Sequence, residues 1–221
     1  QVDLLTMGGT YGLSPGNPVP LVQSRIESIA LVAGVAQPVE SRDVGDLNTA
    51  RWYGQAVLLP TGQVMLFSGG DQDEVIGPGA EAPIMEPELY DPVSETWKVM
   101  ARQGHARTYH NTAMLLADGR VMVSGHAPIP NGYGYNQELP GKAPQGRDPS
   151  FEIYSPPYVF KQRPAILSLS ANSAAPGAAL TINTPHAASV ASSGYVVLVR
   201  RPAITHLVDG DQRNVVLRLL S

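Results

Sequence analysis

The sequence predicts an all-β fold, and two observations support this prediction: the composition and an internal repeat. The 221 residues include 22 Gly and 20 Pro but only 15% charged residues, a balance typical of short strands joined by tight turns. The apolar runs, such as 196–199 and 215–217, are far shorter than the about 20 residues of a membrane span. One segment of the chain is also repeated. The apolar fraction of 43% suffices for a packed core.

Composition and missing motifs exclude several classes of function. The net charge is −4 without any run of Lys or Arg, so neither nucleic acid nor an anionic membrane surface is an expected partner. The chain has no Walker A loop, no HExxH, no GxSxG and no GxGxxG after a strand, so nucleotide binding, zinc proteolysis and serine hydrolysis lack their motifs. Without cysteine, there is neither a disulfide nor a thiolate ligand.

The repeat predicts two β-hairpins. Residues 50–70 match residues 106–126, with a one-residue slip between the aromatic residue and the turn. Apolar runs at 56–59 and 113–116 are followed by the turn dipeptides Thr61-Gly62 and Asp118-Gly119, and the chain returns at 64–67 and 121–123.

The residues after the first hairpin extend it to one four-stranded blade of a kelch-type propeller. Gly69-Gly70, Tyr90 and Trp97 follow each other with kelch spacing. The diglycine permits a backbone reversal that a Cβ would obstruct, and the aromatic rings fill the space between blades.

Parts of two more blades are predicted on either side. Gly8-Gly9 and a strand at 28–33 belong to an earlier blade, and the second copy closes with a strand at 151–154. A closed propeller has about 4–8 blades. We therefore expect the remaining blades to precede Gln1.

A Pro-rich joint near residue 160 predicts a domain boundary. Residues 1–160 form the C-terminal blades of a propeller, and residues 161–221 form a second β domain with strands at 179–183, 195–199 and 214–219. We interpret the second domain as an immunoglobulin-like sandwich truncated at its C-terminus, because such a sandwich takes about 100 residues.

The candidate chemistry lies in two segments. Tyr109 and His110 open the innermost hairpin of a blade, where side chains face the central channel of a propeller. Alone, the pair also fits a hydrogen-bonded histidine beside a packing tyrosine. The second segment runs from Thr205-His206 to Gln212-Arg213.

Together, Arg107-Thr108-Tyr109-His110 and Thr205-His206 through Gln212-Arg213 resemble the galactose oxidase and glyoxal oxidase family of copper radical oxidases. The resemblance covers essentially the whole chain, including the Pro-Glu-Leu-Tyr strand at 87–90. It implies a kelch propeller followed by an immunoglobulin-like domain. It also implies a mononuclear copper site in which Tyr109 is the axial phenol ligand and catalytic base, while His110 and His206 are imidazole ligands.

These residue types suit copper, because imidazole nitrogens and a phenolate oxygen in a tetragonal set favour Cu(II). In the family the second one-electron store is a tyrosyl radical cross-linked to cysteine. Since this chain has no cysteine, we expect that Tyr-Cys cofactor upstream. Tyr53 is the alternative radical residue by its Arg-Trp-Tyr context, but its position favours packing between blades.

The resemblance implies the C-terminal portion of a secreted or cell-surface oxidase that converts a primary alcohol or aldehyde and O2 to a carbonyl product and H2O2. This chain alone is expected to be inactive without the N-terminal part of the propeller. Two alternatives stay open: a non-catalytic module that binds carbohydrate or protein, and a copper site without a radical.

The other histidines are expected to be ordinary. His126 is predicted to be a solvent-facing turn residue, with substrate contact as the alternative, and His105 and His186 are not expected to bind metal. The long Gly- and Pro-rich loop at 127–150 is the candidate wall of the substrate opening.

Overall fold

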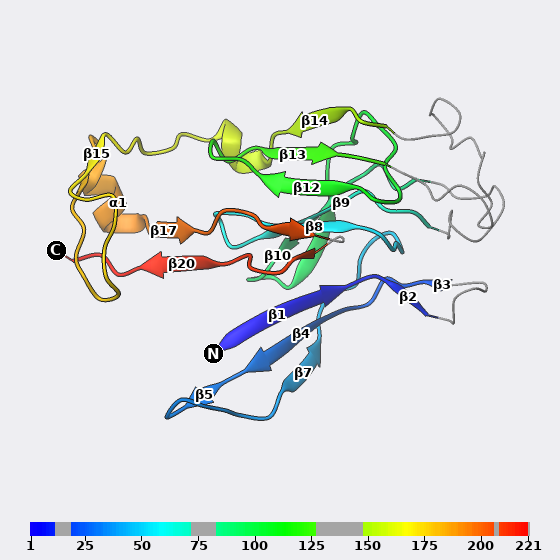
Figure 1. Cartoon of the computed structure of the whole chain (residues 1–221), viewed down its shortest axis with the longest axis horizontal. Helices are drawn as coiled ribbons and strands as arrows, with labels where there is room; N and C mark the ends of the chain where they lie inside the picture. Colours follow the sequence, from blue (N-terminus) through cyan, green and yellow to red (C-terminus); the bar gives the residue numbers. More distant parts are fainter. Residues whose placement is uncertain (12–18, 72–82, 127–147, 206–207, 221) are drawn as a thin grey trace.

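The computed structural model confirms the all-β class. It describes residues 1–11, 19–71, 83–126, 148–205 and 208–220, in which strands dominate (Figure 1). The helical segments in this part of the chain are a 3-10 turn, Pro157–Phe160, and the α-helix α1, Ala187–Ser193. None of the described helices is long and apolar enough to span a membrane.

The predicted complete blade is a four-stranded antiparallel meander. Its strands are β8 (Gln55–Leu58), β9 (Val64–Phe67), β10 (Glu88–Asp91) and β11 (Thr96–Val99), in the order β11-β10-β9-β8. Register pairs join Val57 to Met65, Met65 to Leu89, and Tyr90 to Trp97. The hairpin prediction from the repeat is therefore confirmed for this copy.

The second copy folds in the same way as a three-stranded sheet of β12 (Thr112–Leu115), β13 (Val121–Ser124) and β14 (Phe151–Tyr154). Its turn glycine, Gly119, has a φ of 88°, and Gly62 in the first copy has a φ of 81°. Both turns need the left-handed region, which glycine adopts without a steric penalty.

The N-terminal sheet contains β1 (Val2–Met7), β4 (Ser24–Ile29) and β7 (Glu40–Asp43) in the order β1-β4-β7. The strand predicted at 28–33 is displaced: β4 ends at Ile29, and β5 (Leu31–Val32) and β6 (Val35–Ala36) form a separate hairpin. The cause is the Ala33-Gly34 turn, whose positive φ angles of 49° and 81° reverse the chain. A further short pair joins β2 (Thr10–Tyr11) to β3 (Val19–Pro20).

Two hydrophobic clusters lie between successive sheets, and β9 contributes to both. Met65 and Phe67 point toward the second repeat, whereas Leu66 points toward the N-terminal sheet. This alternation follows from the period of two in a β-strand and explains why the run is apolar throughout. The first cluster comprises Val57, Leu59, Met65, Phe67, Leu89, Ala113, Val121 and Val123, and the second Ile26, Leu47, Leu66, Tyr90 and Trp97.

The first glycine after each returning strand lies where a side chain would collide with a carbonyl oxygen. A Cβ on Gly8, Gly69 or Gly125 would lie 2.7, 2.4 or 2.6 Å from the oxygen of Arg51, Trp52 or His110, respectively. All three glycines have positive φ. Positive φ and the close approach of a carbonyl oxygen therefore explain the glycine at these positions, whereas Gly70 continues the pairing of β8 with β9 through Trp52 rather than reversing the chain.

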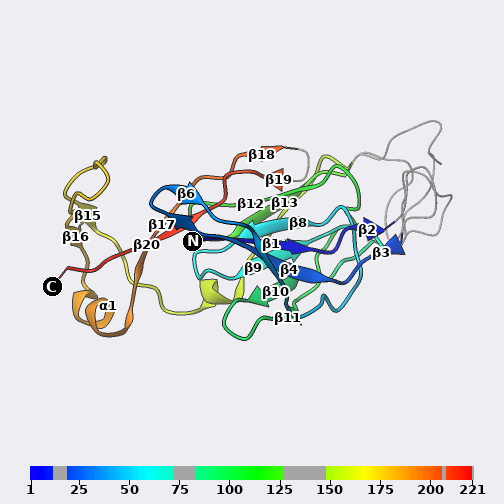
Figure 2. The same cartoon turned by 90° about the horizontal axis from the view of Figure 1, so that it is seen from below.

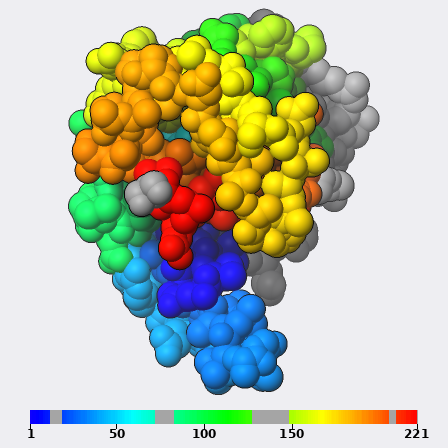
Figure 3. All heavy atoms as spheres, turned by 90° about the vertical axis from the view of Figure 1, so that its left-hand side faces the viewer, coloured from blue at the N-terminus to red at the C-terminus, as the bar shows by residue number. Residues whose placement is uncertain are grey.

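Residues 161–221 form two-stranded ladders: β15 (Ser168–Leu169) with β16 (Ile182–Asn183), β17 (Val196–Val199) with β20 (Asn214–Leu217), and β18 (Ile204–Thr205) with β19 (Val208–Asp209). β15, β16 and α1 lie together at one end of the three sheets, and β17 and β20 lead from there back toward β8 (Figures 1 and 3). The strand predicted at 179–183 is limited to Ile182–Asn183, and α1 was not predicted. In the described residues no sheet closes on itself, so the propeller and the sandwich stay predictions.

Candidate metal centre

The Tyr109-His110 pair lies in the loop directly before β12, and unusual backbone geometry fixes it. His110 has a φ of 49°, a left-handed conformation that is uncommon outside glycine. The Asn111 side chain stabilises the loop, because its Nδ2 donates to the carbonyl oxygens of Tyr53 at 2.8 Å and Thr108 at 3.3 Å. The first of these bonds ties the loop to the corresponding loop of the preceding repeat.

Tyr109 and His110 form the end of a row of rings that crosses the boundary between the two sheets. The centroid distances are 4.1 Å from Trp52 to Tyr53, 4.5 Å from Tyr53 to Tyr109, and 3.9 Å from Tyr109 to His110. Tyr53 meets Tyr109 edge-on at 72°. Tyr53 therefore packs against the next repeat, whose Tyr109 it contacts.

The side chain of Arg107 holds the same loop by hydrogen bonds. Its guanidinium is fully buried, with Nη1 donating to the Gly125 carbonyl at 3.1 Å and Nη2 to Ser150 Oγ at 3.0 Å. Its Nε lies 3.5 Å from Glu152 Oε1. A delocalised cation with five donors can hold several segments at once, which fixes the backbone immediately before Tyr109.

The same arrangement occurs one repeat earlier, and sequence reasoning missed it. Arg51 Nη2 lies 2.6 Å from Glu88 Oε1, and both side chains are buried. The pKa of Arg51 is lowered by burial, against the opposing effect of the Glu88 charge. The repeat could have predicted this pair, because each copy has an Arg before its first strand and a Glu in its third strand.

The prediction for His126 was wrong. Its exposed fraction is 2%, and its Nδ1 accepts a hydrogen bond from the Thr108 backbone N–H at 3.3 Å. The repeat places His126 at the second glycine position, so the sequence suggested an exposed turn. In the fold, His126 is buried against the loop that carries Tyr109 and His110, and its imidazole accepts a hydrogen bond from that loop.

His105 and His186 lie away from the candidate centre. His105 is 3.4 Å from Asp148, and His186 Nδ1 accepts from the Ala165 N–H at 3.4 Å. His206 lies outside the described residues, as does most of the 127–150 loop. Among the described residues, no three His, Cys, Asp or Glu side chains cluster as a metal site. The structure thus brings together Tyr109 and His110.

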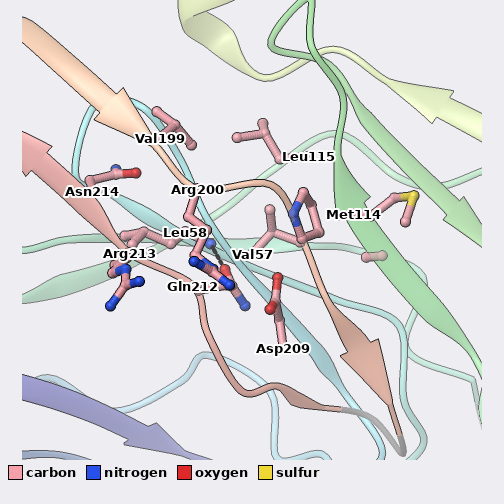
Figure 4. Close-up of a pocket in the computed structure, with 12 residues that line it drawn as sticks. Val57, Leu58, Met114, Leu115, Val199, Arg200, Asp209, Gln212, Arg213 and Asn214 are labelled. Carbon is pink, nitrogen blue, oxygen red and sulfur yellow. Dashed lines mark hydrogen bonds between the residues drawn. The ribbon is translucent and has the colours of Figure 1, made fainter. Parts of the chain in front are cut away.

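The structure describes the two strands on either side of His206 in sequence. β18 and β19 pair with Ile204 opposite Asp209, and β19 lies beside β8 (Figure 2). A small pocket is enclosed where this hairpin crosses β8 and β12, and Met114, Asp209 and Gln212 help to line it (Figure 4). This hairpin therefore runs along the inner strands of both repeats.

The two donors fit Cu(II) by their chemistry. An imidazole nitrogen and a phenol oxygen are ligand types that copper accepts, and both side chains are accessible, with Tyr109 half-buried and His110 exposed. The surrounding hydrogen bonds hold the loop without a metal. This is the pre-organisation that a binding site requires.

Comparison with known proteins gives consistent relatives. The model of the family "Glyoxal oxidase N-terminus" matches residues 33–158. Galactose oxidase of Gibberella zeae is 31% identical over 176 residues, which cover 77% of this chain and 23% of that protein. Aldehyde oxidase GLOX1 of Arabidopsis thaliana is 31% identical over 127 residues, which cover 56% of this chain and 19% of that protein.

A solved structure shares the fold. It is a fungal alcohol oxidase of the AA5 family in complex with copper, with a TM-score of 0.76 and 24% identity. The match covers 98% of this chain and 42% of that one. The chain thus spans less than half of that structure and, at 23% and 19%, about a fifth of the two relatives named above.

Proposed function

Because this chain belongs to the glyoxal oxidase N-terminal family, we propose that it is the C-terminal portion of a copper radical oxidase that oxidises a primary alcohol or aldehyde with O2 to a carbonyl product and H2O2. The observation that carries the proposal is the Tyr109-His110 pair, with ring centroids 3.9 Å apart on a loop that Arg107, Asn111 and His126 hold from three sides.

In this proposal, residues 1–160 are blades of a kelch propeller and residues 161–221 belong to an immunoglobulin-like domain. The fold shared with the alcohol oxidase supports this division. The whole protein acts outside the cell or at its surface. The remaining blades and the tyrosine cross-linked to cysteine belong to other parts of the protein, since this chain has no cysteine.

Three side chains of this chain hold the metal: Tyr109, His110 and His206. When bound, copper supplies a Lewis acid and a one-electron acceptor. The Tyr109 oxygen takes the proton of the substrate hydroxyl as general base. The His110 imidazole is oriented by the left-handed backbone at its own position, and the Tyr53 ring excludes water from one side of Tyr109.

Copper titration of the chain tests the ligand set directly. Bound Cu(II) is followed by electron paramagnetic resonance in the unsubstituted protein, in Tyr109→Phe and in His110→Ala. We expect His110→Ala to weaken binding at least about tenfold, because an imidazole ligand is lost. His105→Gln is the matched control, since His105 lies five residues away and outside the ligand set. Equal affinity in His110→Ala and His105→Gln would refute the assignment.

Turnover tests the reaction. The copper-loaded chain is combined with the preceding part of the propeller and assayed for peroxide over a panel of primary alcohols and aldehydes. Peroxide formation that disappears in Tyr109→Phe supports the oxidase. A protein that holds copper but is silent over the whole panel is a binding module or a copper site without a radical.

A further inference from the structure

The segment from Tyr195 to Leu217, in which β17 pairs with β20 and β18 with β19, is called the C-terminal hairpin. Side-chain amides attach it to β8. Asn214 Nδ2 donates to the Leu59 carbonyl at 2.6 Å, and Gln212 Nε2 donates to the Ala56 carbonyl at 3.0 Å. The Leu58 backbone N–H donates to Gln212 Oε1. At the base of the hairpin, Tyr195 Oη donates to the Pro60 carbonyl at 3.4 Å. The contacts extend from β8 into the turn that follows it.

Gln212 occupies an open strand edge. β8 is the terminal strand of its sheet, and it pairs with β9 on one side only. Backbone groups of alternate residues in such a strand point away from the sheet. The Gln212 carboxamide presents one acceptor and one donor to Leu58 and Ala56, as a peptide group of a neighbouring strand would. Glutamate lacks the donor, and a cationic side chain lacks the acceptor.

The tip of the hairpin is coupled to Gln212 through Asp209. The Gln212 N–H donates to the Asp209 carbonyl at 3.5 Å. Asp209 Oδ1 accepts from the Ala203 N–H at 3.1 Å and the Asp211 N–H at 3.4 Å. An ion pair joins Arg200 to Asp211 across the hairpin. The strands β18 and β19, which flank His206 in sequence, are therefore linked to Gln212 by hydrogen bonds through Asp209, which lies beside Gln212 in Figure 4.

Building on the proposed function, we infer that Gln212 is a positioning residue: it fixes where β18 and β19, the strands on either side of His206 in sequence, lie along β8, and the proposed copper ligand His206 depends on that position. Equivalent docking sites on a strand edge recur every two residues, about 7 Å apart. A metal–imidazole bond is about 2 Å long, so a shift by one docking site would remove the ligand. The two hydrogen bonds of the Gln212 carboxamide therefore fix one position of β18 and β19 along β8.

A distance measurement tests the docking without copper. The chain has no cysteine, so spin labels can be placed at Ala203→Cys, near the tip, and Val93→Cys, whose exposed fraction is 93%. Double electron–electron resonance should give a narrow distance distribution for the unsubstituted protein. Gln212→Ala and Gln212→Glu should broaden the distribution or displace it by about 7 Å.

Two controls separate positioning from folding. Tyr195→Phe removes a bond of the same hairpin to the same sheet and should leave the tip distribution unchanged. A label pair at Leu198→Cys and Val93→Cys reports the hairpin base and should not respond to Gln212→Ala. Circular dichroism confirms that each variant is folded, and Gln212→Glu, which keeps the side-chain size, provides a second test if Gln212→Ala is unfolded.

Electron paramagnetic resonance of bound Cu(II) then tests whether the position set by Gln212 determines that His206 is a ligand. The nitrogen splitting in electron paramagnetic resonance should change from two imidazoles to one in the Gln212 variants, with Tyr195→Phe unchanged. An undisturbed tip in folded Gln212 variants, or a displaced tip that keeps both imidazoles, would overturn the inference. If the unsubstituted chain binds no copper, the proposed function fails, and the distances alone decide whether Gln212 sets the tip position.

Discussion

Replacing Glu88 by Gln should destabilise the protein far more than the equivalent replacement of Glu152. Glu88 is fully buried, and its carboxylate accepts from Arg51 Nη2 at 2.6 Å, Asn48 N at 2.7 Å, Asn48 Nδ2 at 2.8 Å and Thr49 N at 3.1 Å. An amide in either orientation turns an N–H₂ group toward donors. Arg51 is then a buried cation without its counter-charge.

The magnitude follows from burial. Removing one partner of a buried ion pair costs about 3–5 kcal/mol. Three carbonyl oxygens, of Thr49, Ser68 and Glu86, stay near Arg51, so we expect the lower end of that range. Glu152 is 20% exposed, and Arg107 keeps a second carboxylate, Asp148, whose Oδ2 lies 3.8 Å from its Nη1, so Glu152→Gln should cost about 1 kcal/mol.

Urea unfolding followed by circular dichroism measures both variants in the same chain. Comparing the two free energies of unfolding cancels most of the extrapolation error. The double variant with Arg51→Met should recover part of the loss, because it removes the unpaired charge. The reasoning is refuted if Glu88→Gln costs no more than Glu152→Gln, or if Arg51→Met adds its full cost to Glu88→Gln.

Three further outcomes are expected. Gly69→Ala should lower the unfolding free energy by at least about 1 kcal/mol more than Gly62→Ala, since both have positive φ but only Gly69 would bring a Cβ within 2.4 Å of a carbonyl oxygen. Burial raises the pKa of Tyr158 to about 12 from 10.0, so the folded state keeps a proton that the unfolded state releases. Its contribution to stability is complete below pH 10 and is lost as the pH rises toward 12, and the alkaline decline should be shallower in Tyr158→Phe. His126→Leu should cost about 1–3 kcal/mol, because the buried Thr108 N–H loses its acceptor.

Each of these outcomes has its own check. Equal urea midpoints for the two glycine variants would mean that the backbone near Trp52 can move aside. Identical stability curves of the unsubstituted protein and Tyr158→Phe above pH 10 would mean that the phenol is not held in its neutral form. For His126, the matched control is the exposed His105→Leu, which should be close to neutral, and a similar loss in both would contradict the supporting role of His126.

The alternation of apolar residues and the repeat were enough to predict both hairpins and their turns. Val64 to Phe67 form the returning strand, and Gly62 forms the turn, because each depends on neighbouring residues along the chain. The Tyr109-His110 candidate was also visible, since its two members are adjacent in sequence.

Tertiary structure decided what depends on distant segments. The burial of His126 was missed because its environment is the Thr108 backbone, which belongs to another loop. Gln212 was noted only as part of a motif, although its partners Ala56 and Leu58 lie across the interface with β8. The sequence by itself determined the strands, the turns and the candidate donor types, because short-range sterics and strand periodicity are written locally. Only the tertiary structure decided which loop supports Tyr109 and His110 and where the C-terminal hairpin docks, because buried hydrogen bonds are satisfied by whichever groups the folded chain brings within about 3 Å.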